Sequence, residues 1–172
     1  MAKVSVNLGA RSYDIHIGAN LLEQSGQIIK EGARSENLFL VSNPTVFSLY
    51  GAAVIKSCED SGLKVVATLI PDGEEYKTMG QAEEVIGEAI RRGIDRESLL
   101  VALGGGVVGD LAGFVAAVYQ RGIDFVQIPT TLLAQVDSSV GGKVAVNHQA
   151  GKNMIGAFHQ PRTVIVDVHT LA

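Results

Sequence analysis

Two short stretches near the start of the chain alternate between apolar and polar residues. Residues 4–8 carry Val, Val and Leu at every second position, and residues 13–17 repeat the pattern with Tyr, Ile and Ile. A period of two is typical of a strand with one buried face, because successive side chains of a strand point to opposite sides. The pattern therefore predicts an N-terminal β-hairpin.

Five later stretches are short and mainly apolar, and segments with helical spacing separate them. They cover residues 38–41, 65–70, 99–103, 124–128 and 162–168. Runs of this length are typical of strands that are buried on both faces. Strands that alternate with helices through short connections form a parallel sheet flanked by helices. We therefore predict an α/β fold, a Rossmann-like parallel sheet flanked by helices, in one domain over residues 1–172.

Residue types that cap helices mark where several of the predicted helices begin. Asn43 precedes a proline, which favours the first helical position, and Thr78 stands three residues before Gln81, the spacing of a capping box. We expect Asn20 to cap the first helix in a similar way. A further helix is expected to begin at the apolar residues that follow Thr131.

Three consecutive glycines follow the central apolar run, at positions 104–106. Glycine reaches positive φ without steric cost and lets a ligand approach the backbone closely. Apolar residues return at helical spacing from Val107, so we expect the turn to lead into a helix whose first N–H groups favour an anion. The run GGGVVGD therefore indicates a phosphate site. A tight turn that binds nothing remains open, because the run is less specific than a P-loop and is not a G-x-G-x-x-G fingerprint.

Four segments should meet at one edge of the predicted sheet. Ligands of parallel α/β sheets bind at the carboxyl ends of the strands, and residues 42–44, 72–77, 104–110 and 129–131 all follow predicted strands. Several polar loops on one edge favour an extended ligand such as a dinucleotide.

Composition and charge exclude several classes of function. The 172 residues are 47% hydrophobic, enough for one core, yet no apolar run approaches the ~20 residues of a membrane span. A net charge of −4 without a basic block argues against nucleic acid as a partner. The single cysteine, Cys58, excludes an internal disulfide and is typical of a cytoplasmic protein. The four histidines show no metal-ligand spacing.

Two polar stretches in the second half of the chain carry groups that could act on a substrate. Lys143 and Lys152 each stand next to a glycine, where an ammonium can approach a phosphate or a carboxylate. Arg121 could add a bidentate clamp, and Asp137 opens the first stretch. Solvated loop charges are the alternative for both lysines. A hydrolase triad is not expected, because Ser138 lacks a paired histidine base in its sequence context.

Together these motifs resemble the 3-dehydroquinate synthase family. The resemblance covers at least residues 71–161 and lies in the runs DGEEYK, LGGGVVGDLAGFVAAVYQRGI, IPTTLLAQVDSSVGGKVAVNH and GKNMIGAFHQP. It implies an NAD-binding α/β domain that packs against a mainly helical carboxyl-terminal domain, with the active site between the two.

The resemblance also implies roles for individual residues. The substrate and catalytic positions would be Arg121, Asp137, Lys143, Lys152 and Asn153. The cofactor positions would be Asn43, Asp72, Gly73, Glu74, Glu75, Tyr76, Lys77, Gly105, Gly106, Val107, Val108, Gly109, Asp110, Thr130, Thr131, Lys143, Lys152, Thr170 and Leu171. Glu74 and Lys77 would contact the adenosine end of NAD.

The implied reaction converts 3-deoxy-arabino-heptulosonate 7-phosphate to 3-dehydroquinate and phosphate, a step of the shikimate pathway. In this family NAD oxidises a ring hydroxyl transiently, phosphate leaves, and the hydride returns, so the cofactor is not consumed. The substrate is a small sugar phosphate that also carries a carboxylate. Cationic side chains inside an acidic protein suit such a dianionic ligand.

The resemblance further implies a divalent metal, zinc or cobalt, held by a glutamate and two histidines beyond position 172. We therefore expect this chain to be a truncated part of the enzyme, with no metal ligands of its own, inactive alone, and homodimeric in the whole protein. Two alternatives remain. One is another sugar-phosphate cyclase or the related glycerol-1-phosphate dehydrogenase, and the other is a non-catalytic nucleotide-binding module.

Overall fold

The central apolar run forms an inner strand of a seven-stranded sheet. The computed structural model describes all residues from Met1 to Ala172. The strands follow the order β1-β2-β9-β6-β5-β3-β4, and every neighbouring pair except β1 and β2 is parallel. Their bounds are β1 Ala2–Val6, β2 Tyr13–Gly18, β3 Asn37–Ser42, β4 Lys64–Leu69, β5 Leu99–Gly104, β6 Phe125–Pro129 and β9 Thr163–Asp167. The α/β fold with a parallel sheet is therefore confirmed.

The N-terminal hairpin forms as the alternation predicts. β1 and β2 pair antiparallel, with Val4 opposite Ile15, and a short 3₁₀ turn at Gly9–Arg11 lies between them. β2 then pairs in parallel with β9, so the hairpin extends the main sheet on one side.

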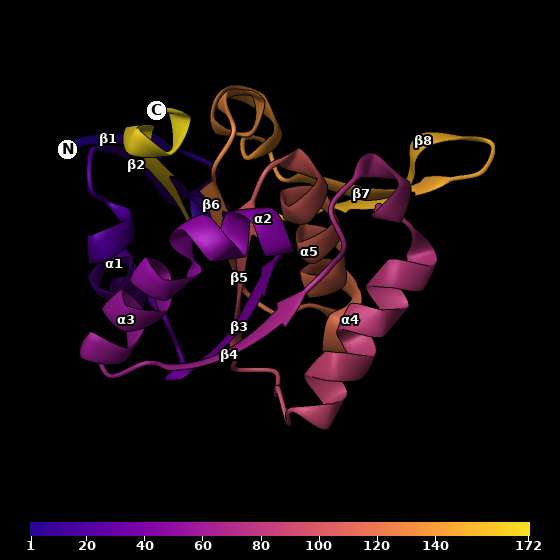
Figure 1. Ribbon diagram of the computed structural model, residues 1–172, viewed down its shortest axis with the longest axis horizontal. Coiled ribbons are helices and arrows are strands. Elements are labelled where there is room, and N and C mark those ends of the chain that lie inside the picture. Colours follow the sequence, from indigo (N-terminus) through magenta and orange to yellow (C-terminus); the bar gives the residue numbers. More distant parts are fainter.

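Helices cover both faces of the sheet. α1 (Ser25–Gly32) and α3 (Ala52–Asp60) lie on one face, and α4 (Met79–Arg91) and α5 (Gly106–Val118) lie on the other (Figure 1). A short helix α2 (Pro44–Val46) continues through the π-helical turn Phe47–Gly51 into α3. None of these helices combines the length and the apolar character that a bilayer crossing requires.

The sequence of β5 is continuously apolar because both faces of the strand are covered by helices. Leu100 and Ala102 belong to the core under α4 and α5, whereas Leu99, Val101 and Leu103 belong to the core under α1 and α3. Every residue of the strand is buried. Each large side chain buried in this way stabilises the fold by about 1.5–3 kcal/mol.

The expected caps are partly correct. Asn43 Oδ1 accepts a hydrogen bond from Val46 N at 3.3 Å, and Thr78 Oγ1 accepts one from Gln81 N at 3.2 Å, so both residues cap helices. The Gln81 amide, however, binds Glu84 and does not complete a capping box.

The cap expected at Asn20 is wrong. The Asn20 backbone has φ +57°. The Asp167 carboxylate, at the end of β9, accepts from Asn20 N at 3.2 Å and from Leu22 N at 3.0 Å. A side chain from the far end of the chain therefore replaces the local cap at the start of the 3₁₀ turn Leu22–Gln24.

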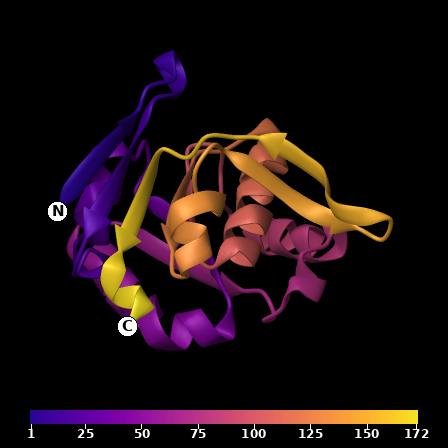
Figure 2. The same cartoon turned by 90° about the horizontal axis from the view of Figure 1, so that it is seen from above.

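A two-stranded antiparallel ribbon, β7 (Lys143–His148) and β8 (Gly151–Phe158), lies outside the main sheet. Figure 2 shows it passing over α5 and projecting beyond the helices. Val144 and Val146 are buried against α5, and the ribbon approaches so closely that a Cβ at Gly113 would overlap Val144. Lys143 and Lys152 therefore lie in strands, and the loop position considered for both lysines is wrong.

The helix expected after Thr131 forms, over residues 132–138. It becomes π-helical over Ala134–Ser138, and its apolar residues Leu132, Leu133 and Val136 are exposed rather than packed on the sheet.

Cys58 is a buried core residue of α3, as expected of a lone cysteine. It packs in the core shared by α1 and α3, and burial raises the pKa of its thiol to about 11. The thiol therefore stays protonated at neutral pH.

Gly26 sets the separation of α1 and α3, and its substitution provides a test of this packing. A Cβ at this position would overlap the backbone carbonyl of Ser57, which no rotamer change can relieve. We expect Gly26→Ala to lower the free energy of unfolding by about 2–3 kcal/mol in urea denaturation. Gly32→Ala, at the end of the same helix with open space around its Cβ, is the matched control and should not destabilise. Equal stability of the two variants would contradict the close packing.

Candidate active site

The loops that follow the parallel strands lie at one edge of the sheet, as the sequence predicts. β3, β4, β5 and β6 all run in the same direction, so residues 42–44, 72–77, 104–110 and 129–131 leave the sheet at its carboxyl edge. Thr130 N donates to Gly104 O at 3.0 Å, which holds two of these segments side by side.

The glycine turn leads directly into α5, with Gly105 as the N-cap residue. The first hydrogen bond of the helix runs from Gly109 N to Gly105 O, so the N–H groups of residues 106–108 have no partner within the helix. These groups and the helix dipole make the turn suitable for an anion.

The positive φ expected at this turn is wrong, since residues 104–106 do not adopt it. Close packing favours the glycines instead, most strongly at Gly104. A Cβ on Gly104 would lie 2.7 Å from the side chain of Val108, one on Gly105 would lie 3.1 Å from Thr131, and one on Gly106 would lie 3.3 Å from Ser138 Oγ.

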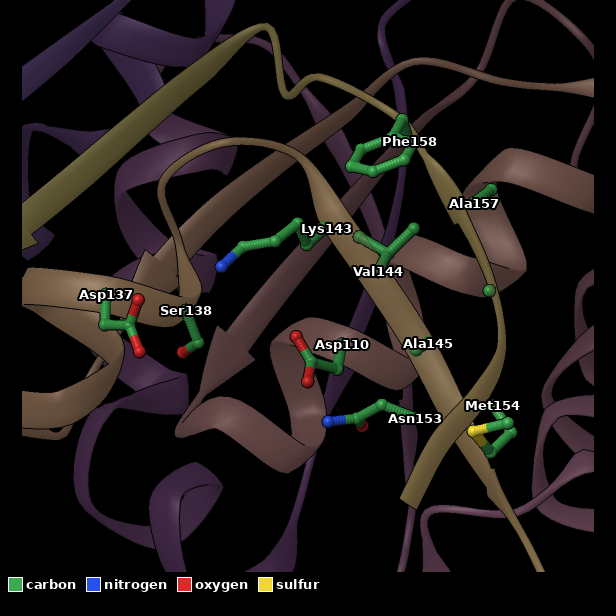
Figure 3. A pocket seen from close by; sticks show the side chains of 11 residues that line it. Asp110, Asp137, Ser138, Lys143, Val144, Ala145, Asn153, Met154, Ala157 and Phe158 are labelled. Carbon is green, nitrogen blue, oxygen red and sulfur yellow. The ribbon is translucent and has the colours of Figure 1, made fainter. Parts of the chain in front are cut away.

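An open cavity of about 510 Å³ lies between the start of α5, the turn after β6 and the ribbon. The Lys143 side chain extends toward Asp137 and Ser138, and Asn153 points toward Asp110 (Figure 3). The structure thus brings together four residues that the sequence selects from distant segments: Asp110, Asp137, Lys143 and Asn153. Ser138 and Met154 also line the cavity, and sequence reasoning did not select either.

A buried ion pair lies beside this cavity. Lys77 Nζ is 2.6 Å from Asp110 Oδ2 and 2.6 Å from Asn153 Oδ1, and the two charged side chains are only 5% and 16% exposed. Burial raises the pKa of Asp110, and the Lys77 ammonium partly opposes this effect. The ammonium therefore joins the loop after β4, the amino-terminal part of α5 and the ribbon.

Lys152 lies on the ribbon at the rim of the site. Its ammonium is 3.9 Å from Glu74 Oε1, and both side chains are exposed. Such a contact adds little stability, so the ammonium is free to turn toward a ligand.

Other predicted cofactor residues have varied surroundings at the carboxyl edge. The Asn43 side chain is engaged in its cap, and Asp72 accepts a hydrogen bond from Thr45. Gly73, Glu75, Tyr76 and Leu171 are exposed, and Val107 is partly buried. The Val108 side chain is buried in the core, so only its backbone can face a ligand.

Two threonines at this edge differ in their hydrogen bonding. Thr130 is 6% exposed, and its buried Oγ1 has no hydrogen-bond partner. Thr170 is also buried, but its hydroxyl donates to Asp167 O and accepts from the Gln135 amide. Thr130 therefore has hydrogen-bonding capacity left for a ligand, whereas Thr170 is already engaged. No pattern in the sequence predicted that Gln135 and Asp167 take part in this network.

Of the predicted substrate and catalytic residues, Lys152 and Arg121 do not line the cavity, and Arg121 also lies at a different edge of the sheet. It follows the carboxyl end of α5, in the turn that precedes β6, and so lies at the amino edge of the sheet. The 13 residues of α5 separate it from the glycine turn by about 20 Å.

Metal ligation has no candidate among these residues. No three His, Cys, Asp or Glu side chains gather closely enough to hold a metal ion.

Removing the Lys77 ammonium should destabilise the fold, because the buried ion pair loses its cation. Lys77→Met leaves the Asp110 carboxylate buried without a cation, and we expect the free energy of unfolding to fall by about 3 kcal/mol in urea denaturation. Adding Asp110→Asn should restore much of the loss. Lys56→Met, which breaks the exposed pair with Asp60, is the control and should change nothing measurable. Similar stability of the Lys77 and Lys56 variants would show that the pair is not desolvated.

Comparison with solved structures identifies synthases of the same architecture. A 2-deoxy-scyllo-inosose synthase solved with carbaglucose-6-phosphate, NAD⁺ and Co²⁺ superposes with a TM-score of 0.90 at 29% identity, covering 99% of this chain and 47% of that chain. The 2-epi-5-epi-valiolone synthase of Streptomyces hygroscopicus, solved with NAD⁺ and Zn²⁺, gives 0.84 at 28% identity, over 96% of this chain and 45% of that one.

Sequence comparison gives the family. The model of the 3-dehydroquinate synthase N-terminal domain matches residues 67–172. The 3-dehydroquinate synthases of Pelotomaculum thermopropionicum and Desulforamulus reducens are 57% and 54% identical over 99% of this chain. They are matched over 46% and 48% of their own length, so the chain spans about half of these relatives. With a family model matching most of its residues and relatives this similar along its whole length, the chain belongs to the 3-dehydroquinate synthase family.

Proposed function

We propose that this chain forms the NAD-binding part of a 3-dehydroquinate synthase, which converts 3-deoxy-arabino-heptulosonate 7-phosphate to 3-dehydroquinate and phosphate. The observation that carries the proposal is the meeting of Asp110, Asp137, Lys143 and Asn153 at one cavity beside the anion-favouring start of α5, in a chain of this family. A cytoplasmic location and a homodimer of the whole protein belong to the same proposal.

The residues at the carboxyl edge fit a dinucleotide. The N–H groups of residues 106–108 would donate to the pyrophosphate, and the orphaned Thr130 hydroxyl would gain the partner that it lacks. Glu74 and Asp72, on the exposed loop after β4, would accept hydrogen bonds from the adenosine hydroxyls. When bound, NAD supplies the capacity to accept a hydride from the substrate and return it.

One cation in the cavity, Lys143, and a second on the adjoining ribbon, Lys152, suit an acidic sugar phosphate. Lys143 and Lys152 would offset the phosphate and the carboxylate, and Asp137 and Asn153 would hydrogen-bond the hydroxyls. The substrate role predicted for Arg121 remains a proposal. The structure does not support it, because Arg121 lies at the amino edge of the sheet.

The divalent metal of the whole enzyme is also part of the proposal. Co²⁺ and Zn²⁺ accompany the solved relatives, but the side chains of this chain form no cluster that fits such an ion. No metal role is therefore assigned to these residues, and the inactivity expected of the 172-residue chain alone follows from the same proposal.

Another sugar-phosphate cyclase is the less favoured function. The solved 2-deoxy-scyllo-inosose synthase is 29% identical to this chain over the aligned residues, against 57% for a curated 3-dehydroquinate synthase.

Calorimetric titration of the 172-residue chain with NAD tests cofactor binding. We expect Thr130→Val to raise the Kd for NAD about 5- to 10-fold, the effect of one lost hydrogen bond. Stability should not fall, because the variant removes a buried hydroxyl that has no partner in the free protein. Thr68→Val on edge strand β4, remote from the glycine turn in the sheet order, is the control and should leave the Kd unchanged. Absence of NAD binding by wild type would contradict the cofactor assignment.

Turnover tests the reaction itself in a protein extended to the length of its curated relatives. We expect release of phosphate and 3-dehydroquinate from the heptulosonate phosphate, and a fall in kcat/KM of about 100-fold for Lys152→Ala, because substrate orientation is lost. Thermal unfolding should be unchanged, since Lys152 is exposed. Lys64→Ala, at the amino end of β4, is the matched control. An unchanged rate for Lys152→Ala would remove that residue from the site.

A further inference from the structure

The ladder of the ribbon is interrupted where it reaches the candidate site. Val146 pairs with Ile155, but the next pair is His148 with Gly151. Asn147 on β7 is therefore opposed by three residues of β8: Lys152, Asn153 and Met154. A bulge of this kind leaves backbone groups unpaired and changes the direction of side chains, and bulges are common beside active sites.

Asn153 has the most unusual backbone in the bulge. Its φ is +55°, a left-handed conformation that asparagine tolerates better than most residues. Its side chain consequently leaves the ribbon toward Asp110 and lines the cavity (Figure 3). The bulge therefore determines where Asn153 points.

Asn147 fills the bulge with three hydrogen bonds, one to the opposite strand of the ribbon and two to the loop after β4. Its Oδ1 accepts from Asn153 N at 2.9 Å, its backbone N donates to Lys77 O at 2.8 Å, and its Nδ2 donates to Glu74 Oε1 at 2.9 Å. The first bond pairs an N–H that the ladder leaves free. The other two join the ribbon to the loop after β4.

These bonds position two parts of the candidate site: Asn153, and Glu74 beside the ammonium of Lys152. Asn153 is held through its backbone by Asn147 and through its side chain by the Lys77 ammonium, 2.6 Å away. Glu74, which Asn147 also holds, is the acid nearest to the ammonium of Lys152.

We propose that Asn147 is a positioning residue that holds the bulge in shape, so that Asn153 and Lys152 face an anionic ligand while Glu74 and Lys77 stay joined to them. The inference rests on the proposed function only for the identity of that ligand. Asn147 itself does not line the cavity and acts through its three partners.

The first test uses the 172-residue chain and inorganic phosphate as the probe. Asn147→Ala should speed hydrogen exchange of the Asn153 amide about 5- to 10-fold by NMR, because one hydrogen bond is lost. Phosphate affinity, followed at the Lys143 and Lys152 resonances, should fall by a similar factor. Asn37→Ala, an exposed strand asparagine whose side chain has no hydrogen bond, is the matched control and should change neither.

The second test is a charge rescue that a merely structural role would not produce. Asn147→Asp keeps the acceptor for Asn153 N but places a carboxylate against Glu74, so phosphate affinity should fall. Glu74→Gln supplies an amide donor to Asp at position 147 and should return affinity to within about twofold of Glu74→Gln alone. Glu75→Gln removes the same charge from the neighbouring exposed residue and should not rescue.

The outcomes separate this proposal from the proposed function. Loss of Asn153 protection and of phosphate affinity in Asn147→Ala supports the positioning role even if the chain binds no NAD. NAD binding with unchanged phosphate affinity in Asn147→Ala overturns the positioning role and leaves the cofactor assignment intact. Failure of the wild-type chain to bind phosphate, or equal rescue by Glu74→Gln and Glu75→Gln, also overturns it.

Discussion

Strand β5 is hydrogen-bonded along both edges and covered on both faces, and the position of the candidate site depends on that burial. Its parallel pairing with β3 and β6 satisfies backbone groups that would otherwise be buried without partners, so the strand cannot slip without exposing its side chains. The same pairing sets Gly104 opposite Pro129, and the glycine turn therefore leaves the sheet beside Thr130. The pairing of β5 with its neighbours therefore packs the core and also places the anion-favouring start of α5 at the edge of the sheet.

Cationic side chains at this edge allow a chain of negative net charge to bind an anionic ligand. The net charge is −4, yet the cations of the site are held locally, on the ribbon and on the loop after β4. Lys77 is the most restricted of them, because it lies between Asp110 and Asn153 with little access to water. Such a pair gains little net stability, since desolvation offsets most of the attraction, but it permits only one arrangement of the three segments it joins.

The ribbon contributes side chains to the candidate site that neither the main sheet nor its helices supply. Lys143, Lys152 and Asn153 all come from β7 and β8, which extend beyond the helices and contact the rest of the domain mainly through α5. An irregular ladder, supported by Asn147, turns part of this ribbon back toward the loop after β4. The candidate site therefore combines an edge of the main sheet with a projecting ribbon that has its own local geometry.

The sequence by itself determined the sheet, its parallel order of strand and helix, the hairpin and the caps at Asn43 and Thr78, because period, burial and local hydrogen bonding are written in neighbouring residues. It also selected the glycine turn, although the positive φ expected there is absent and the strongest constraint is the packing of Gly104 against Val108. Only the tertiary structure decided the pairing of Lys77 with Asp110, the replacement of Asn20 by Asp167 as a cap, the ribbon and its bulge, and the separation of Arg121 from the cavity. Each of these depends on which distant segments become neighbours, and a pattern of adjacent residues carries no record of that.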